Sequence, residues 1–168
     1  HDGIDTDAIA PNAAASVVLG GKLALTRQNE VITFVNRNLE PYRGYHIFIR
    51  ALPEILRRRP NARIFIVGSD GVSYGAAPPE GKKWKDVFLD EVKDQLDLSR
   101  VHFLGNVPYR NFIALLQLST VHVYLTYPFV LSWSLLEAMC CGCAIVASDT
   151  QPVREAIVDR ETGRLVDF

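Results

Sequence analysis

The feature that most constrains the fold of this chain is an alternation between short apolar runs and longer segments of helical periodicity. The apolar runs are rich in β-branched and aromatic residues, which predicts buried strands. They span residues 31–35, 64–67, 101–104, 121–125 and 144–147. Segments with helical spacing lie between them, at 44–58, 84–96, 109–118 and 134–141. Because strands that alternate with helices favour right-handed crossovers, we predict an α/β fold with a Rossmann-like parallel sheet and helices on both faces.

The remaining segments are expected to be irregular. Residues 1–30 contain small residues, aspartates and the pair Gly20-Gly21, which indicates a linker followed by a short helix or loop. Residues 69–83 are rich in Gly, Pro and Ser and predict a long loop. The way the chain opens and stops suggests a piece of a longer protein. We therefore expect a lead-in segment over 1–30 and a truncated domain over 31–168.

Composition excludes several classes of protein. The chain has 168 residues, which suits one domain, and a net charge of -1. Since there is no basic field, nucleic acid is not an expected partner. No apolar run is long enough to span a membrane, and the N-terminus lacks the pattern of a signal peptide.

The three cysteines are clustered at positions 140, 141 and 143. A disulfide framework spreads its cysteines along the chain, and a structural zinc site usually needs two spaced pairs of ligands. We therefore expect no metal here, and small apolar residues at the end of a helix in a reducing compartment. The four histidines form no recognisable nucleophile motif, so covalent catalysis is not indicated.

Ligands of parallel α/β sheets bind beyond the carboxyl ends of the strands, which directs attention to the loops after the predicted strands. The first of these loops carries Arg37 and Arg43, just before a helix N-terminus. Guanidinium groups beside a helix N-terminus can hold a diphosphate. The alternative is a solvated loop, because most arginines are exposed.

A second candidate site is the strand–loop–helix junction over residues 132–139. Backbone N–H groups of the first helical turn, around Ser132 and Ser134, can bind phosphate. Glu137 lies one turn further, where its carboxylate can accept two ribose hydroxyls. The alternative is a capping box, in which Glu137 returns a hydrogen bond to the backbone of Ser134. The sequence leaves both roles open.

Glycines at strand ends give a weaker signal. Gly68 follows the second predicted strand, where it serves a turn or lets a ligand approach the backbone closely. No G-x-G-x-x-G motif follows a strand and no P-loop is present, which argues against a dehydrogenase and an NTPase.

Taken together, these motifs resemble the donor-binding domain of the group 1, family 4 glycosyltransferases, which forms the C-terminal half of a GT-B fold. The matching segments occur in the family's order over nearly the whole chain. They are residues 2–5, 35–44, 66–68, 101–105, 135–142 and 161–166.

The resemblance implies a role for each candidate residue. Arg37 and Arg43 would neutralise the donor diphosphate and stabilise charge on the leaving nucleotide. Glu137 matches the second glutamate of the family's E-x7-E signature, which binds ribose. Backbone amides of Ser134 and Leu135 would meet phosphate. Further donor-binding residues implied by the resemblance are Gly68, Asn106, Val107 and Ser132, with Asn106 and Val107 in the base-binding loop.

The implied activity is retaining transfer of a hexose from a UDP-, GDP- or ADP-sugar to a hydroxyl acceptor, with no metal or cofactor. An N-terminal acceptor domain of the same protein would complete the enzyme, so this chain alone should be nearly inactive. The implied location is the cytoplasm, with contact between the missing half and the inner face of a membrane left open.

One departure from the family pattern stands out. Phe129 occupies the position of the first glutamate of E-x7-E, which contacts the donor sugar. A degenerate donor domain that binds nucleotide or a partner without transfer is therefore the main alternative. A nucleotide-sugar epimerase of the same fold is a third, for which no acid–base residues are identifiable.

Overall fold

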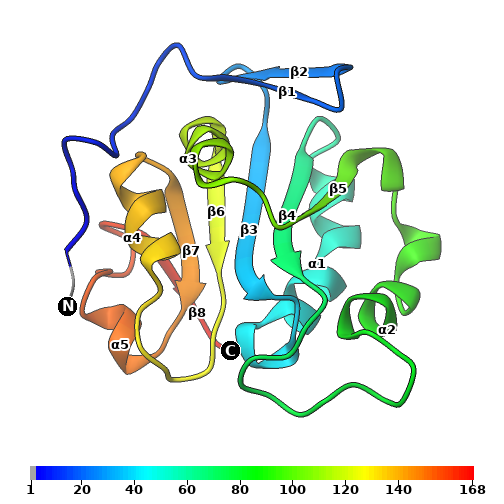
Figure 1. Cartoon of the computed structure of the whole chain (residues 1–168). Helices are drawn as coiled ribbons and strands as arrows, with labels where there is room; N and C mark the ends of the chain where they lie inside the picture. Colours follow the sequence, from blue (N-terminus) through cyan, green and yellow to red (C-terminus); the bar gives the residue numbers. More distant parts are fainter. Residues whose placement is uncertain (1–2) are drawn as a thin grey trace.

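A six-stranded, wholly parallel sheet lies at the centre of the computed structural model, which describes residues 3–168 (Figure 1). Its strands run in the order β5-β4-β3-β6-β7-β8. Their bounds are β3 (Val31–Asn38), β4 (Arg63–Ser69), β5 (Val101–Gly105), β6 (Val121–Tyr124), β7 (Ala144–Ser148) and β8 (Arg164–Val166). The five predicted strands are confirmed, and β8 adds a sixth that the sequence analysis missed.

Helices cover both faces of this sheet, as predicted (Figure 1). The helices are α1 (Tyr45–Arg58), α2 (Trp84–Asp90), α3 (Tyr109–Leu118), α4 (Trp133–Cys140) and the short α5 (Gln151–Arg154). Alternate residues of β3 face opposite layers: Phe34 stacks on Phe48 of α1, whereas Val35 joins the core formed with α3 and α4. A strand buried on both faces needs apolar residues throughout, which explains the unbroken apolar runs.

The strand order reverses between β3 and β6. From β3 the chain builds outward through β4 and β5, then returns to add β6, β7 and β8 on the other side. The crossovers on the two sides leave in opposite directions, so a crevice opens beyond the carboxyl ends of β3 and β6. The fold itself therefore selects the loops after these two strands as the place for a ligand.

Residues 3–15 are irregular, as expected of a linker, but the short helix or loop expected after them is wrong for residues 16–26. Strands β1 (Ser16–Leu19) and β2 (Leu23–Thr26) form an antiparallel hairpin. Gly20 and Gly21 both have left-handed backbone angles in its turn, and Leu25 is fully buried in the core shared with α3. Asp2, in the first of the segments that resemble the family (residues 2–5), lies outside the described residues.

The helix predicted over 84–96 is also shorter than expected. It ends at Asp90, and two single turns follow, Lys93–Gln95 and Leu98–Arg100. Glu91 pairs with Arg50 of α1 at 2.6 Å, and Val92 turns into the core. These tertiary contacts end the helix despite a sequence with good helical spacing.

A buried polar chain links β3 and β6. Thr33 Oγ1 lies 2.9 Å from Nδ1 of His122 and 2.8 Å from the Ser119 hydroxyl. Nε2 of His122 has no hydrogen-bond partner among residues 3–168. Complete burial lowers the pKa of His122 to about 4, so the folded protein holds this imidazole neutral.

Stability should therefore fall as the pH drops from 6.5 towards 4. In that range the unfolded chain binds a proton at His122 and the folded chain does not, which costs up to about 1.4 kcal/mol per pH unit. Urea unfolding across this range tests the prediction, with His122→Leu as the non-titrating control. Identical pH profiles for the two proteins would contradict it.

Candidate functional site

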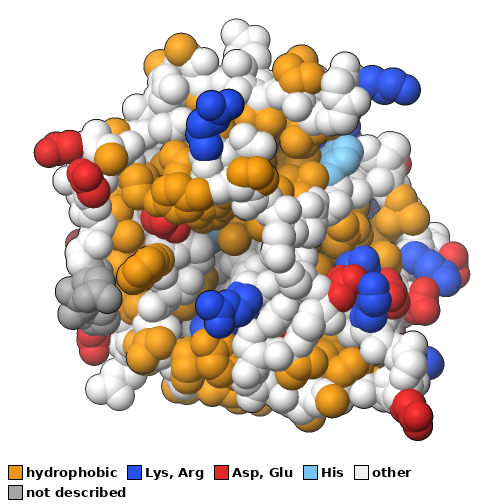
Figure 2. All heavy atoms as spheres, in the orientation of Figure 1, with side chains coloured by type: hydrophobic (Ala, Val, Ile, Leu, Met, Phe, Trp, Pro, Cys, Tyr) orange, Lys and Arg blue, Asp and Glu red, His pale blue; other side chains and the backbone are white. Residues whose placement is uncertain are grey.

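An open cavity of about 830 Å³ lies at the carboxyl ends of β3 and β6. Figure 2 shows it as a hollow in the molecular surface, with basic side chains at one edge and hydrophobic side chains around its rim. Its lining comes from the ends of β3 and β4, the turn Pro41–Arg43, the β5–α3 loop with the start of α3, and the β6–α4 loop with the start of α4. Tyr74 adds a side chain from the long loop predicted over 69–83, which we call the insert. The cavity brings together most of the residues predicted from sequence, namely Arg37, Arg43, Asn106, Val107, Ser132, Ser134 and Glu137.

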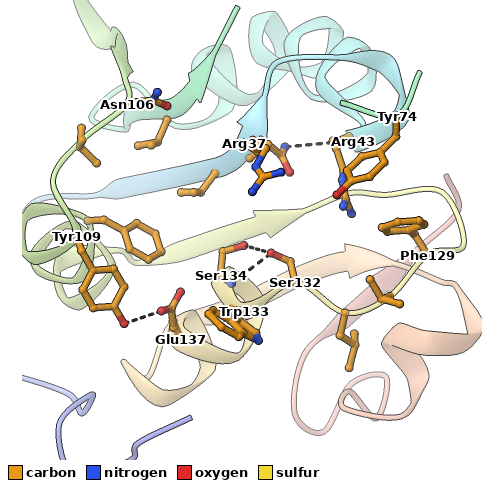
Figure 3. A pocket seen from close by; sticks show the side chains of 17 residues that line it. Arg37, Arg43, Tyr74, Asn106, Tyr109, Phe129, Ser132, Trp133, Ser134 and Glu137 are labelled. Carbon is orange, nitrogen blue, oxygen red and sulfur yellow. Dashed lines mark hydrogen bonds between the residues drawn. The ribbon is translucent and has the colours of Figure 1, made fainter. Parts of the chain in front are cut away.

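Arg37 enters the cavity from an irregularity in β3. The strand continues to Asn38, further than predicted, but its pairing with β4 shifts register between Val35 and Asn38. Such an irregularity redirects side chains away from the regular alternation. Arg37 is exposed, points into the cavity (Figure 3), and forms no ion pair with any carboxylate in the described chain.

Arg43 lies beside Arg37 but is half-buried and more firmly held (Figure 3). Its Nη1 donates to Thr126 Oγ1 at 3.1 Å, just beyond β6. Its guanidinium carbon lies 5.0 Å from the ring centre of Tyr74 and 4.9 Å from that of Phe129. Within residues 3–168 no carboxylate pairs with it. The cavity thus holds two cations whose charge is not neutralised by the protein.

Gly44 explains how Arg43 reaches Thr126. The single turn Pro41–Arg43 ends at Gly44, whose φ of 73° is left-handed, and α1 starts at the next residue. A Cβ atom at position 44 would collide with the Cβ of Leu125 and lie 3.2 Å from its backbone. Only glycine therefore lets the turn approach the end of β6 closely.

The N-terminus of α4 faces the arginines across the cavity (Figure 3). Ser132 caps the helix, because its hydroxyl accepts from the backbone N–H of Ser134 at 3.3 Å. The N–H of Ser132 in turn donates to the hydroxyl of the buried Tyr124 at 3.1 Å. Leu135 is fully buried and does not line the cavity, and its N–H donates to the Ser132 carbonyl at 3.2 Å.

Glu137 is buried, yet its carboxylate reaches the far end of the cavity. The capping-box interpretation is wrong, since the cap is Ser132 and Glu137 Oε1 instead accepts from the Tyr109 hydroxyl at 2.6 Å (Figure 3). This hydrogen bond raises the pKa of Tyr109 to about 12, so Tyr109 remains a neutral donor. The carboxylate keeps further acceptor positions for a ligand.

Asn106 and Gly68 occupy different positions relative to the cavity. Asn106 lines it, and its Oδ1 accepts from Ser69 Oγ at 2.8 Å, which ties the β5–α3 loop to the end of β4. Gly68 does not line it: a Cβ there would lie 2.8 Å from Leu39 Cδ2 and 2.9 Å from the Asn36 carbonyl. The backbone at Gly68 is therefore approached closely by Leu39 and Asn36 of the protein itself.

Three residues that contribute to the site were given no role by sequence reasoning: Glu40, Tyr74 and Thr126. Tyr109 was expected only as part of the base-binding loop over 106–109, and its contact with Glu137 was not predicted. Glu40 is fully buried and accepts from backbone N–H groups of the insert. The only local sign of this role in the sequence was that Glu40 directly precedes a proline near a strand end. Tyr74 lies in a segment without periodicity, so nothing in the sequence placed it over Arg43.

The cysteines are free, and Cys141 and Cys143 are buried beyond the end of α4. Cys143 Sγ donates to the Leu116 carbonyl at 3.2 Å. The predicted packing role for these small apolar side chains is confirmed. In the part of the chain that the structure describes, no helix is both long and apolar enough to cross a membrane.

Comparison with known proteins adds a family match. Residues 21–168 match the family described as glycosyl transferases group 1. A phosphatidyl-myo-inositol mannosyltransferase of Mycobacterium tuberculosis is 28% identical over 168 residues, which cover 98% of this chain and 38% of that protein. An uncharacterized glycosyltransferase of Methanocaldococcus jannaschii is 31% identical, over 80% of this chain and 31% of its own length. The chain thus spans about a third of the length of these relatives.

Solved structures share the fold. The C-terminal domain of a group 1 glycosyl transferase protein from Francisella tularensis aligns with a TM-score of 0.75 at 21% identity, covering 98% of this chain and 80% of that one. The Anabaena protein HepE, solved with UDP and glucose, aligns with a TM-score of 0.61 at 23% identity, over 83% of this chain and 34% of that one. The six-stranded sheet is therefore that of a GT-B C-terminal domain.

Proposed function

Because the chain belongs to the group 1 glycosyl transferases, we propose that its cavity binds a nucleoside diphosphate sugar as the donor for transfer of a hexose to a hydroxyl acceptor. The observation that carries this proposal is the pair Arg37 and Arg43. Neither has a carboxylate partner within residues 3–168, and both face the N-terminus of α4 across the cavity (Figure 3). Two free guanidinium groups opposite a helix N-terminus suit a diphosphate.

The order of groups along the cavity suggests how the donor lies. Glu137 and Tyr109 stand at one end, the arginines and Ser132–Ser134 in the middle, and Tyr74 and Phe129 at the other end (Figure 3). We assign the ribose to Glu137, the diphosphate to the middle and the sugar to the aromatic end. Asn106 and Val107 are then placed to meet the base.

The chemistry follows from charge. Breaking the bond between the anomeric carbon and the diphosphate leaves negative charge on the departing oxygen. Arg37 and Arg43 would stabilise that charge in a fixed geometry, which is electrostatic catalysis and needs no metal ion. We propose that transfer retains the anomeric configuration and that the acceptor is bound by a domain outside this chain.

The relatives support the hexose class of donor. One is a mannosyltransferase by name, and one structural neighbour was solved with UDP and glucose. These substrates belong to those proteins. For this chain the base remains open between uracil, guanine and adenine.

Glu137 should determine the affinity for ribose. Among UDP, GDP and ADP, the one that binds most tightly should bind about tenfold better than its 2′,3′-dideoxy analogue, because two hydroxyls donate to the carboxylate. Glu137→Gln should abolish that preference, as measured by calorimetric titration. Tyr109→Phe, which leaves the carboxylate intact, should keep it. A preference that survives Glu137→Gln would remove Glu137 from the ribose site.

A second candidate function is a degenerate donor domain that binds nucleotide without transfer, favoured by Phe129 at the sugar end. The longer protein that contains this chain distinguishes the two. Release of nucleoside diphosphate from a nucleotide sugar, with retention at the anomeric carbon seen by proton NMR, supports the transferase. Binding without any turnover would support the degenerate domain.

A further inference from the structure

Aromatic rings orient the guanidinium of Arg43. A cation in a protein is more commonly paired with a carboxylate. Tyr74 and Phe129 lie on the guanidinium, and their own ring centres are 4.8 Å apart with planes tilted by 47°. Tyr42 extends this cluster, with its ring centre 6.0 Å from that of Tyr74 and 5.9 Å from that of Phe129. The rings come from three separate segments, and Figure 3 shows those of Tyr74 and Phe129 beside Arg43.

This arrangement fixes the cation without using its hydrogen-bond donors. A guanidinium has five N–H groups in one plane, and a carboxylate would take two of them. Cation–π contacts are made by the faces of the rings, so they leave the N–H groups free. Thr126 takes one of these donors, through Nη1 at 3.1 Å, and the guanidinium also interacts with the hydroxyl of the buried Tyr124. The remaining donors stay available for phosphate oxygens.

Tyr74 is positioned by a buried carboxylate. Glu40 is fully buried, and its Oε2 accepts from the backbone N–H groups of Ser73, Tyr74 and Gly75 at 3.1, 3.3 and 3.2 Å. These contacts fix the insert over 69–83 to Glu40, which lies two residues after the end of β3 and two residues before Tyr42. A buried carboxylate is costly unless such donors satisfy it, so the insert and Glu40 stabilise each other.

We propose that Tyr74 and Phe129 are positioning residues that orient Arg43 towards the diphosphate, and that Glu40 holds the Tyr74 ring over the Arg43 guanidinium. The diphosphate part of this inference rests on the proposed function. On this view Phe129, where the family pattern leads one to expect a glutamate, makes Arg43 a better phosphate ligand. The insert then contributes to the donor site through Tyr74.

Two variants test the orientation of Arg43 in the free protein. In Phe129→Leu and Tyr74→Leu the Arg43 side chain should become more mobile, seen by NMR as slower transverse ¹⁵N relaxation and a lower heteronuclear NOE of its Nε–H. Tyr74→Phe keeps the ring and should keep the wild-type relaxation. Unchanged Arg43 mobility in both leucine variants would overturn the proposal. This arm needs no ligand, so it stands even if no nucleotide binds and the proposed function fails.

Affinity for a nucleoside diphosphate gives the second arm. Each leucine variant should bind about three- to tenfold more weakly than wild type, and Tyr74→Phe should match wild type. Equal loss in Tyr74→Phe would assign the effect to the hydroxyl and contradict a role for the ring.

A double-mutant cycle tests the role of Glu40. Glu40→Gln and Tyr74→Leu should not be additive in their effect on affinity, because Glu40 acts through Tyr74. Additive losses would refute that link. If circular dichroism shows that Glu40→Gln does not fold, Ser73→Pro takes its place in the cycle. This variant removes one of the N–H donors to Glu40.

Discussion

Replacing Arg43 with alanine should weaken binding of a nucleoside diphosphate by about 10- to 100-fold, the usual cost of a lost hydrogen bond to a charged group. In a protein that joins this chain to the proposed acceptor domain, turnover should fall by about 100- to 1,000-fold, since the lost cation faces charge that grows in the transition state. Arg37→Ala should act in the same direction but less strongly, because Arg37 is exposed and lacks the contacts that orient Arg43.

The matched control for Arg43→Ala is Arg58→Ala. Arg58 is an exposed arginine at the C-terminus of α1, paired with Glu54 at 2.6 Å, and its loss should leave affinity unchanged. Arg43→Lys keeps the charge but not the planar fork of donors, so its affinity should lie between wild type and alanine. Equal affinity of Arg43→Ala and wild type, measured by calorimetry, would exclude Arg43 from the site.

Replacing Gly44 with alanine should destabilise the fold by about 4 kcal/mol or more, a size found only when a specific structural element is broken. Two costs add: a left-handed φ of 73° and a collision with Leu125 that neither backbone can relieve locally. The turn would have to move away from β6 and would take Arg43 away from Thr126. Urea unfolding measures the loss of stability, and the variant should also bind nucleotide poorly.

Gly20→Ala provides the comparison for Gly44→Ala. Gly20 has a similar φ of 56°, but a Cβ there would have no atom within 4 Å. Its replacement should cost only about 1–2 kcal/mol, the price of a left-handed backbone alone. Similar losses in the two variants would show that close packing at Gly44 is unimportant.

The sequence predicted the elements whose signals are local. The five apolar runs and the helices around α1, α3 and α4 appear nearly where expected, because burial on both faces requires an unbroken apolar run. The hairpin around Gly20-Gly21 was missed, since its four-residue strands are mostly exposed or half-buried and lack the unbroken apolar run of a strand that is buried on both faces. Strand β8 has only three residues and was missed for the same reason.

Site residues were predictable where the fold dictates their position. Arg37 lies near the end of β3, Arg43 follows that strand, and the start of α4 follows β6. The strand order places β3 and β6 side by side. The contacts that orient them were not predictable. Thr126 reaches Arg43 only because Gly44 packs on Leu125, and Tyr74 does so only because Glu40 fixes the insert.

The most direct test of the diphosphate site is an NMR titration of this chain with UDP, GDP and ADP, following the backbone amide shifts. At least one of the three should shift the backbone amide signals of residues 36–44, 106–109 and 132–137 together, because a single ligand would span the cavity that these segments line. A second, smaller cavity of about 340 Å³ between β1 and α3 offers an internal comparison. Shifts confined to that region, or no shifts with any of the three nucleotides, would contradict a diphosphate site between Arg37, Arg43 and Glu137.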